Sequence, residues 1–503
     1  MTTSIEDLPE EMLVKIFTHL ELEDRKTTAA VCHRWSRLAL RWTELQLVVD
    51  FRRPGEEDTI HRILLCSSRP YRHLVLYFGY DYAKCKLLLQ ILEKFSSTMD
   101  TLKLLPNNFV PVEIEFLANM LKFCSNLKRL HVDACTFQHQ TDAEINFPPL
   151  NNLCDLYLEN NLLDLPEIDF REVTPNITGL HLQISYYSKR PQQFLQHFCA
   201  RLKELEVWFL TEDHFASVCG MNFPLLEKVN FYSVDSSFDD SRSLDSLAGF
   251  FQRCAKLKDV TLRCNANEHV LGRIAPFCSN LQCLCISIEE LSEECFRYLS
   301  ELRCLKRLRI EDAIIHAPDP GHCSPFKKLQ MLSLYSVHIR DPKKFNTFAS
   351  TLCPALAILE LLHLCCGMNE ATMFKFYSAI CSNLLYLQRL VLHESEKLLD
   401  LDLFFYFASL SQLRELRLQF RGLTDYICTY ESNLVFIRSL SIDVPSINDT
   451  CLLKLLELLP TVNRLHLSSV NDCSAEGIRQ ARERLPLCDI SVKQRVRIEE
   501  RLS

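Results

Sequence analysis

The hexapeptides LQCLCI (281–286), LKRLRI (305–310) and LQMLSL (329–334) decide the fold of this chain. Each has apolar residues at its first, fourth and sixth positions, and the three start 24 residues apart. Apolar residues at alternate positions are typical of a short strand with one buried face. The return to a parallel neighbouring strand needs a dozen or more residues, usually including a helix. A unit of 24 residues has room for that return.

The same frame occurs seventeen times between Trp42 and Leu467, and successive copies start 24 to 31 residues apart. Apolar stripes at helical spacing lie between several frames, for example at Phe194, Leu195 and Phe198. The repetition predicts an α/β solenoid, with parallel strands on its concave face and helices on its convex face. We expect LPLCDISV (485–492) to be a final half-repeat and the charged tail 493–503 to be its cap.

The cysteines follow the repeat. Five of them stand three residues before the first apolar position of a frame, where the preceding helix ends and faces the core: Cys124, Cys199, Cys254, Cys278 and Cys353. Buried cysteine behaves as a small hydrophobic residue. The cluster of Cys283, Cys285, Cys295 and Cys304 suggests zinc, but the frame assigns the first two to a strand and the others to the helical side. We therefore expect no metal site.

The stretch DLPEEMLVKIFTHLELEDRKTTAAVCHRW (7–35) predicts three short helices ahead of the repeats. Asp7 can cap the first helix, and Pro9 has no amide to leave unpaired. We expect the second helix to start at Glu23 and the third to run from about His33 to Leu40. Three helices of this size rarely stabilise themselves. Another surface must therefore cover the apolar side chains Leu8, Pro9, Ile16, Phe17 and Trp35.

This stretch resembles an F-box. The resemblance lies in Leu8-Pro9 near the start, the Ile16-Phe17 pair, Leu20 at the end of the first helix, Asp24 in the second, and the motif Val31-Cys32-His33-Arg34-Trp35. It implies docking on a Skp-type adaptor, and through it on cullin and RING subunits of a Skp–cullin–F-box (SCF) ubiquitin ligase. The residues that it implies for adaptor binding are Leu8, Pro9, Met12, Ile16, Phe17, Leu20 and Trp35.

The repeats resemble leucine-rich repeats of the cysteine-containing class, which is common behind F-boxes. Together the two resemblances divide the chain into an F-box domain (1–41), a solenoid of about 17 leucine-rich repeats (42–492) and a C-terminal cap or tail (493–503). Trp42 follows Trp35 by only seven residues, so we expect the two modules to be rigidly joined.

Composition narrows the classes of partner and compartment. The chain of 503 residues has 56 Lys and Arg against 64 Asp and Glu, a net charge of −8, which argues against nucleic acid as a partner. No signal peptide is visible, and no apolar run is long enough for a membrane span. The 24 cysteines are expected to be reduced thiols, and the location cytoplasmic, nuclear or both.

Sequence signatures of enzymes are absent. The ten glycines form neither a dinucleotide fingerprint nor a phosphate-binding loop, and neither H-E-x-x-H nor G-x-S-x-G occurs. Many Cys–His pairings are conceivable, but no feature selects one. We expect no catalytic residue and no cofactor, and the F-box resemblance leaves ubiquitin transfer to the cullin-bound RING–E2 module.

The recognition face can be located from the frame. The residue between the last two apolar positions, and the residue after the last one, should point into the concave face. Large aromatic residues and arginines dominate binding hot spots. Positions of this kind that we predict to contact a protein substrate are Tyr157, Trp208, Tyr232, Arg263, Arg309 and Tyr335.

The main hypothesis is a non-catalytic, substrate-recognition subunit of an SCF-type ubiquitin ligase, whose repeats bind the protein to be ubiquitinated. Three alternatives stay open. The chain could be a scaffold that binds partners without degradation, a receptor for a small molecule, or an enzyme with its site in the repeats. Loss of ubiquitination without loss of target binding, on mutation of the F-box, would favour the ligase over the scaffold.

Overall fold

The structure is a computed structural model. It describes residues 5, 8–18, 20, 22–39, 46–52, 56–67, 71–78, 83–106, 111–133, 136–138, 146–158, 170–183, 190–209, 211–233, 241–364, 370–394, 406–420, 434–443, 447–468 and 473–492. The chain divides into two compact units, Met1–Leu210 and Thr211–Ser503. The predicted cap Asp7 and the tail 493–503 lie outside the described residues.

The first unit begins with the three predicted helices, α1 (Glu10–Thr18), α2 (Leu22–Ala29) and α3 (His33–Ala39). The carbonyl of Pro9 accepts hydrogen bonds from the amides of Met12 and Leu13, each 3.1 Å long, so Pro9 opens the first turn of α1. The helices enclose a small core of their own, formed by Leu13, Phe17, Leu38 and Ala39. The prediction of three short helices is confirmed.

The rest of the first unit alternates parallel strands with helices. The strands that pair in chain order are β1 (Gln46–Asp50), β2 (His73–Phe78), β3 (Thr101–Pro106), β5 (Arg129–Val132), β7 (Asp155–Leu158), β8 (Gly179–Gln183) and β9 (Glu204–Phe209). The helices are α4 (Glu56–Cys66), α5 (Ala83–Phe95), α6 (Ile114–Lys122), α7 (Phe170–Val173) and α8 (Arg190–Phe198). Short strands β4 (Pro111–Glu113) and β6 (Thr136–Gln138) pair beside them.

The second unit repeats the pattern. Its strands, each paired in parallel with the next, are β10 (Lys228–Ser233), β11 (Asp259–Ala266), β12 (Cys283–Ile288), β14 (Arg307–Glu311), β16 (Met331–Tyr335), β18 (Ile358–Leu362), β19 (Arg389–Glu394), β20 (Glu415–Phe420), β21 (Ser439–Asp443), β22 (Arg464–Ser468) and β23 (Asp489–Val492). Its helices are α9 (Glu212–Cys219), α10 (Ser241–Arg253), α11 (Glu268–Ile274), α12 (Glu293–Glu301), α13 (Pro342–Leu352), α14 (Glu370–Asn383), α16 (Asp449–Leu458) and α17 (Ala475–Arg484).

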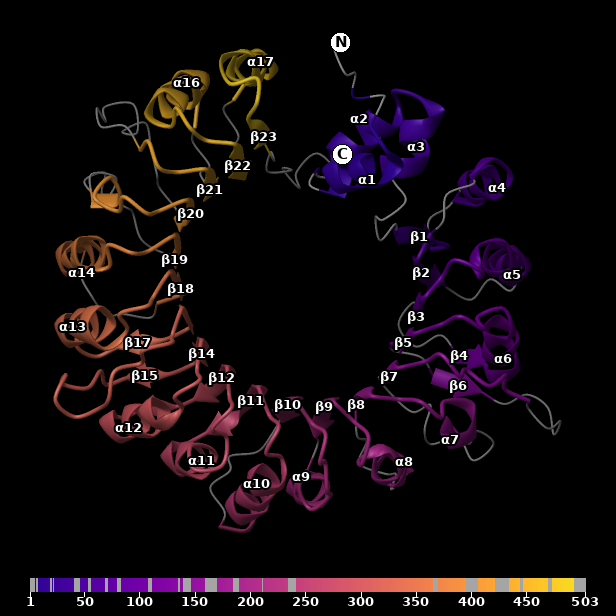
Figure 1. Ribbon diagram of the computed structural model, residues 1–503, viewed down its shortest axis with the longest axis horizontal. Helices are drawn as coiled ribbons and strands as arrows, with labels where there is room; N and C mark the ends of the chain where they lie inside the picture. The colour runs from indigo at the N-terminus through magenta and orange to yellow at the C-terminus, as the bar shows by residue number, and fades with distance from the viewer. Residues whose placement is uncertain are drawn as a thin grey trace, which may run out of the picture. The chain divides into compact units, whose positions relative to one another are not determined.

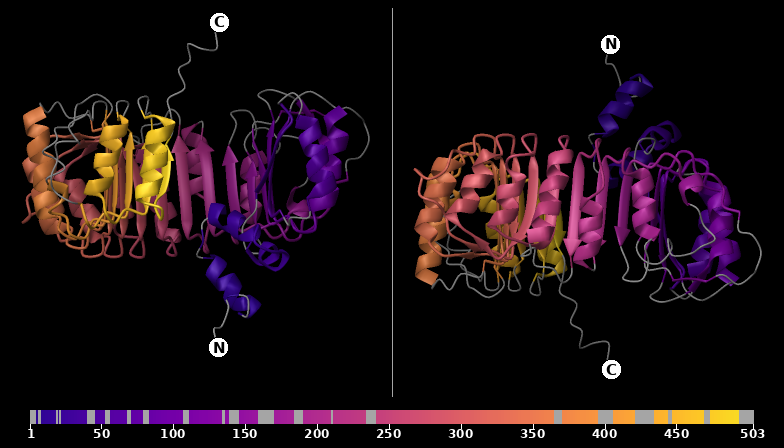
Figure 2. Two further views of the ribbon diagram at one scale, coloured as in Figure 1. Left: turned by 90° about the horizontal axis from the view of Figure 1, so that it is seen from above. Right: turned by 90° about the horizontal axis from the view of Figure 1, so that it is seen from below.

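The register follows the sequence frame. From β2 to β22 each strand of these two series starts two residues after the first apolar position of its frame. The apolar positions of one frame, Leu305, Leu308 and Ile310, are all buried, as in its neighbours. Within each unit the strands line the inner side and the helices line the outer side (Figure 1). A view turned by 90° shows neighbouring strands of a unit side by side, with the helices of that unit in a row next to them (Figure 2). The predicted parallel strands with an outer helical layer are confirmed.

One crossover lacks the expected helix. Between β14 and β16 every residue is described, and this segment contains only β15 (Ile314–Ile315) and turns. Strand β15 lies between β13 (Glu290–Leu291) and β17 (His338–Ile339) in a small parallel sheet, which the frame did not predict. Pro318, Pro320 and Gly321 in the middle of the segment disfavour a helix, which is a physical reason for the difference.

The cysteine predictions are mostly confirmed. Cys124, Cys254, Cys278 and Cys353 are buried. The prediction that Cys199 is buried is wrong, because this side chain is only half-buried. Phe198 fills the core at the end of α8, and its neighbour Cys199 points in a different direction. Among the described helices, none is long and apolar enough to cross a membrane.

Candidate functional site

The first candidate surface is an exposed apolar face on α1. Met12 is 49% exposed and Ile16 is 38% exposed, and Pro9 at the start of the helix is exposed as well. Residues four apart lie on the same face of a helix. Large apolar side chains at this exposure, grouped on one face, indicate a surface that a partner covers.

The opposite face of α1 packs inside the unit. Phe17 is only 3% exposed, and its ring centroid lies 5.3 Å from that of Trp35 at an angle of 59°. Trp35, Leu8 and Leu20 are partly buried against the same core. The prediction that Phe17 contacts an adaptor conflicts with this burial, because one residue along a helix turns the side chain by about 100° away from Ile16. Phe17 supports the exposed face from behind.

Two contacts hold α3 against the start of α1. Nη2 of Arg34 donates a hydrogen bond of 2.7 Å to the carbonyl oxygen of Leu8. Arg37 forms an ion pair with Glu10. These contacts fix the position of the Leu8-Pro9 segment next to Met12, so that the exposed apolar face is built before any partner binds.

The second candidate surface lies on the inner face of the second unit and is centred on Glu311. Nε of Arg263 lies 2.8 Å from one carboxylate oxygen of Glu311, and Nη2 donates to the other over 2.9 Å. Nε of Arg309 donates to that second oxygen over 2.6 Å. The Arg263 guanidinium lies 5.6 Å from the ring centroid of Tyr232, and the Arg309 guanidinium 5.8 Å from that of Tyr335. We call these five residues the Glu311 cluster.

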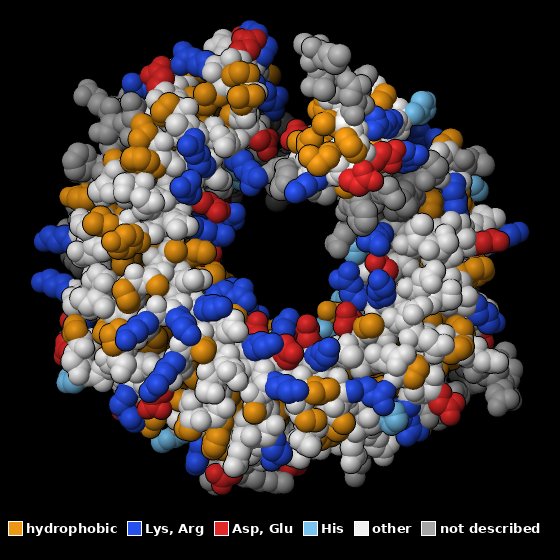
Figure 3. Space-filling view, in the orientation of Figure 1, with side chains coloured by type: hydrophobic (Ala, Val, Ile, Leu, Met, Phe, Trp, Pro, Cys, Tyr) orange, Lys and Arg blue, Asp and Glu red, His pale blue; other side chains and the backbone are white. Residues whose placement is uncertain are grey.

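Burial and exposure divide the cluster. The Glu311 side chain is 8% exposed, whereas those of Arg263 and Arg309 are 42% and 40% exposed. The carboxylate therefore forms the floor, and two guanidinium groups face solvent above it. Burial lowers the pKa of Arg263, but the hydrogen bond and the charge of Glu311 outweigh burial, so the pKa is raised from its ordinary value. Along the inner rim of the strands, Lys and Arg side chains lie next to Asp and Glu side chains (Figure 3).

The backbone around the cluster departs from the regular repeat. The register between β11 and β12 shifts between Leu262 and Ala266, and Arg263 lies within this irregular part of β11. A β-bulge re-aims a side chain in this way. Asp312, Ser336 and His363, each directly after a strand, have positive φ angles of 54–56°, which only a few per cent of non-glycine residues adopt.

In the first unit, the aromatic and acidic residues of the inner face form a separate stack. The ring of Tyr157 lies between those of His131, 5.1 Å away, and His181, 3.6 Å away, with interplanar angles of 5° and 13°. Nδ1 of His181 lies 3.2 Å from Glu206, whose other oxygen accepts from Nε1 of Trp208 over 3.4 Å. Burial, and then the charge of Lys103, lower the pKa of His131 to about 4.

The structure thus separates the predicted substrate contacts into two groups. Tyr232, Arg263, Arg309 and Tyr335 surround Glu311, which the sequence analysis missed. Tyr157 and Trp208 belong to the first unit and to the stack around His181 and Glu206. Glu311 directly follows the last apolar position of LKRLRI, one of the two inward positions of the frame, so the frame itself could have identified it.

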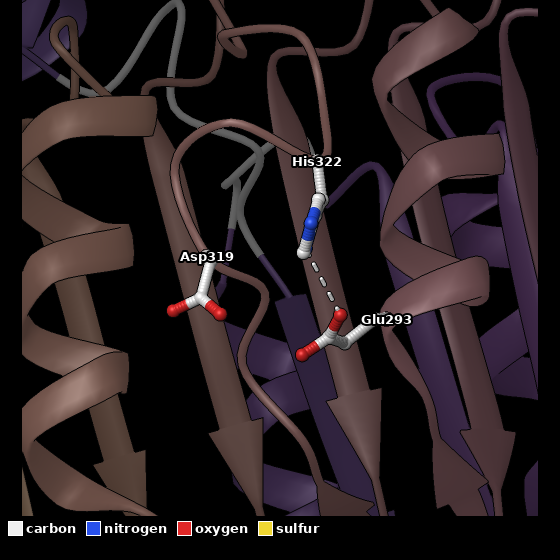
Figure 4. A group of neighbouring side chains, drawn as sticks. All are labelled: Glu293, Asp319 and His322. Atoms are coloured by element: carbon white, nitrogen blue, oxygen red, sulfur yellow. Dashed lines mark ion pairs between the residues drawn. The ribbon is translucent and has the colours of Figure 1, made fainter.

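A group of possible metal ligands lies elsewhere. Glu293 at the start of α12 and Asp319 and His322 in the helix-free crossover place one ligand atom each within 4.8 Å of one another (Figure 4). The ammonium of Lys344 lies 3.7 Å from Glu293 and 3.0 Å from Asp319, so a protein cation already pairs with both carboxylates and offsets part of their charge. The four cysteines that the sequence suggests as zinc ligands each contact a different polar side chain. These pairs are Cys283 with Arg307, Cys285 with Glu311, Cys295 with Ser292 and Cys304 with Lys328.

An open cavity of about 650 Å³ is lined by residues 266–269, 289–290 and Ser292, beyond the ends of β11 and β12. Two of its carboxylates have partners within the protein. Glu290 lies 3.1 Å from Nε2 of His316, and Glu268 accepts from the hydroxyl of Ser292 over 3.3 Å. The carboxylates of the cavity are therefore used in contacts within the protein, and we assign no ligand to it.

The comparison with protein families identifies one part of the chain. The family model described as F-box-like matches residues 5–45, the segment that carries α1, α2 and α3. The comparison with curated proteins found no match. F-box domains generally bind Skp-type adaptors, which agrees with an exposed apolar face on α1. Residues 5–45 therefore form an F-box-like domain, followed by repeated α/β units of parallel strands.

Proposed function

We propose that the chain is a substrate-recognition subunit of an SCF-type ubiquitin ligase. The F-box-like domain binds a Skp-type adaptor, and through it cullin and RING subunits. The repeats, which we take to be leucine-rich repeats of the cysteine-containing class, hold the protein to be ubiquitinated on their inner face. In this proposal the chain catalyses nothing itself, needs no cofactor, and works in the cytoplasm, the nucleus or both.

One observation carries the proposal: an exposed apolar face on α1, within the segment that matches the F-box-like family. Met12 and Ile16 turn outward while their neighbours Leu13 and Phe17 fill the core. Burying one such side chain contributes roughly 1.5–3 kcal/mol. A few well-packed side chains at the centre of an interface carry most of its binding energy, so we expect Met12 and Ile16 to be central contacts.

The experiment is co-purification of the intact chain with a Skp-type adaptor and cullin. The variant Met12→Lys/Ile16→Lys places two charges on the apolar face without removing any core side chain. We expect at least a tenfold loss of adaptor capture, because each lysine abolishes apolar burial and adds a desolvation cost. Leu385→Lys is the matched control, since Leu385 is also apolar and 50% exposed but lies in the second unit.

Circular dichroism and thermal melting establish that the wild type and both variants are folded. Capture by the wild type and by Leu385→Lys, but not by Met12→Lys/Ile16→Lys, supports the proposal. Capture by none of the folded proteins contradicts it, and the scaffold hypothesis then takes its place. Capture by all three would contradict the assignment of the interface to α1.

A further inference from the structure

We propose that the Glu311 cluster binds an acidic segment of the recognised protein, with one carboxylate of that segment held between Arg263 and Arg309. The inference rests on the proposed function, because it supplies the chemistry of the partner that the repeats hold. It concerns the second unit alone. The adaptor-binding face plays no part in it.

The charge balance of the cluster favours an anion. Two guanidinium groups face one carboxylate, so one positive charge is left over in the cluster. Glu311 accepts from Nε and Nη2 of Arg263 and from Nε of Arg309. Glu311 does not use Nη1 of Arg263 or either Nη of Arg309, and both arginine side chains are about two-fifths exposed. A carboxylate from a partner can accept from these donors in the bidentate manner that guanidinium groups favour.

The donors are already in place. Glu311 is buried and holds both arginines, and the rings of Tyr232 and Tyr335 flank them on either side. Arg263 on β11 reaches past β12 to β14, and the register partner of Glu311 on the intervening strand is the small Ser287. A ligand that meets fixed side chains loses less conformational entropy on binding. Arginine and tyrosine are also the residue types that dominate hot spots.

An apolar side chain continues the surface beyond Tyr335. Leu362 on β18 is the register partner of Tyr335 and lies half-buried on the inner face, next to an ion pair of Glu360 with Arg389. Two strand spacings separate β14 from β18, about 9.6 Å. An extended peptide covers that distance in about three residues. The segment should therefore carry a large apolar residue about three positions from its acidic residue.

The charge count selects a carboxylate over a phosphate. The cluster has one positive charge in excess, and one carboxylate brings one negative charge. A phosphorylated side chain would bring about −1.5 to −2 charges, more than the cluster can balance. A phosphorylated side chain is the alternative anionic ligand, and the experiment tests it beside the carboxylate.

The test measures retention of labelled peptide pools on the immobilised full-length protein. Each pool has the form Leu-x-x-Z-x-x-Leu, with x degenerate and Z fixed as Glu, Gln or phosphoserine. We expect at least fivefold more retention of the Glu pool than of the Gln pool. Arg263→Gln and Arg309→Gln should bring the Glu pool down to the level of the Gln pool. Glu311→Gln removes the competing carboxylate and should increase retention of the Glu pool.

Arg297→Gln is the matched control, because Arg297 is an exposed arginine paired with glutamates on α12 outside the cluster. Equal retention of the Glu and Gln pools overturns the inference. So does equal loss with Arg297→Gln, which would show unspecific attraction, or preference for phosphoserine, which would show a phosphate site. Thermal melting verifies that each variant is folded.

The same variants are tested for adaptor capture. If the wild type and Arg309→Gln both capture the adaptor, but the wild type retains the Glu and Gln pools equally, only this inference fails. If the wild type fails to capture the adaptor, the proposed function fails, and the peptide pools still report on the inner face by themselves.

Discussion

Glu311 is a buried carboxylate that separates two arginines, and its removal should be costly. Without it, two guanidinium groups face each other with only solvent between them. We expect Glu311→Ala to lower the free energy of unfolding by about 1–3 kcal/mol, since loss of one buried charged partner leaves the others unpaired. Urea denaturation measures this. Glu294→Ala removes a solvent-exposed partner of Arg297 and should lower the free energy of unfolding clearly less.

His131 should make stability depend on pH. Its pKa is about 4 in the folded protein, against an ordinary value near 6.5, because burial disfavours the imidazolium. Between these two values the unfolded chain binds a proton that the folded chain does not, so stability falls as the pH drops from about 6.5 to about 4. Above 6.5 this residue contributes no pH dependence.

The variant His131→Phe keeps a ring next to Tyr157 but cannot titrate. Its melting temperature should therefore fall less than that of the wild type between pH 7 and pH 4. The comparison is made by thermal melting across this range. A parallel fall in both proteins would mean that His131 is not the group responsible.

For single residues, the sequence predicted which side chains lie on the inner face better than it predicted which of them contact one another. The frame placed Arg263, Arg309, Tyr232 and Tyr335 on the inner face. It could not show that Arg263 reaches past β12 to Glu311, because a contact between side chains two strands apart leaves no mark on the spacing of the apolar residues. Contacts between side chains of different strands depend on local backbone shifts, and a hydrophobic pattern does not reveal such shifts.

Helix α1 shows how one element serves two surfaces. Phe17 and Ile16 are neighbours in sequence, yet the first is core and the second is exposed. We expect Phe17→Ala to destabilise the F-box-like domain by about 3–5 kcal/mol, as the loss of a buried aromatic side chain does. Ile16→Ala should change stability little but weaken adaptor capture.

Thermal melting and co-purification measured on both variants separate the two effects. Little loss of stability in Phe17→Ala would contradict its place in the core. Unchanged capture by Ile16→Ala would count against the exposed face as the docking surface. The pair is matched, since the two residues are adjacent in α1 and both are large and apolar.

Among the elements, strand positions were the most predictable. Their period is short and each strand has one buried face, so the start of β14 or β18 follows directly from the frame. The crossovers were less predictable, because a connection needs only to span the distance between strands. The segment after β14 does so with β15 and turns, and the small sheet that it joins rests on two-residue strands too short to leave a pattern.

At the scale of the molecule, stability should depend on how many neighbours a repeat has. In repeat arrays each unit is stabilised mainly by the units on either side. Leu332 in β16 has a paired strand on both sides, whereas β23, which carries Ile490, pairs with β22 alone among the described strands. Both side chains are buried.

We expect Leu332→Ala to lower the free energy of unfolding by about 2–5 kcal/mol and Ile490→Ala to lower it by clearly less. Urea denaturation followed by circular dichroism measures both. Equal costs at the two positions would argue against nearest-neighbour coupling along the second unit.

The helix-free crossover after β14 also offers a place for engineering. Gly321 lies in its turns, and a Cβ atom added there would meet no atom within 4 Å. Exposed turns of this kind tolerate inserted sequence well. A fluorescent protein or an epitope spliced in next to Gly321 would leave the strands untouched and disturb only surface ion pairs. Such a tagged protein would allow the exchange of adaptors and targets to be followed in living cells, with both chain ends left free.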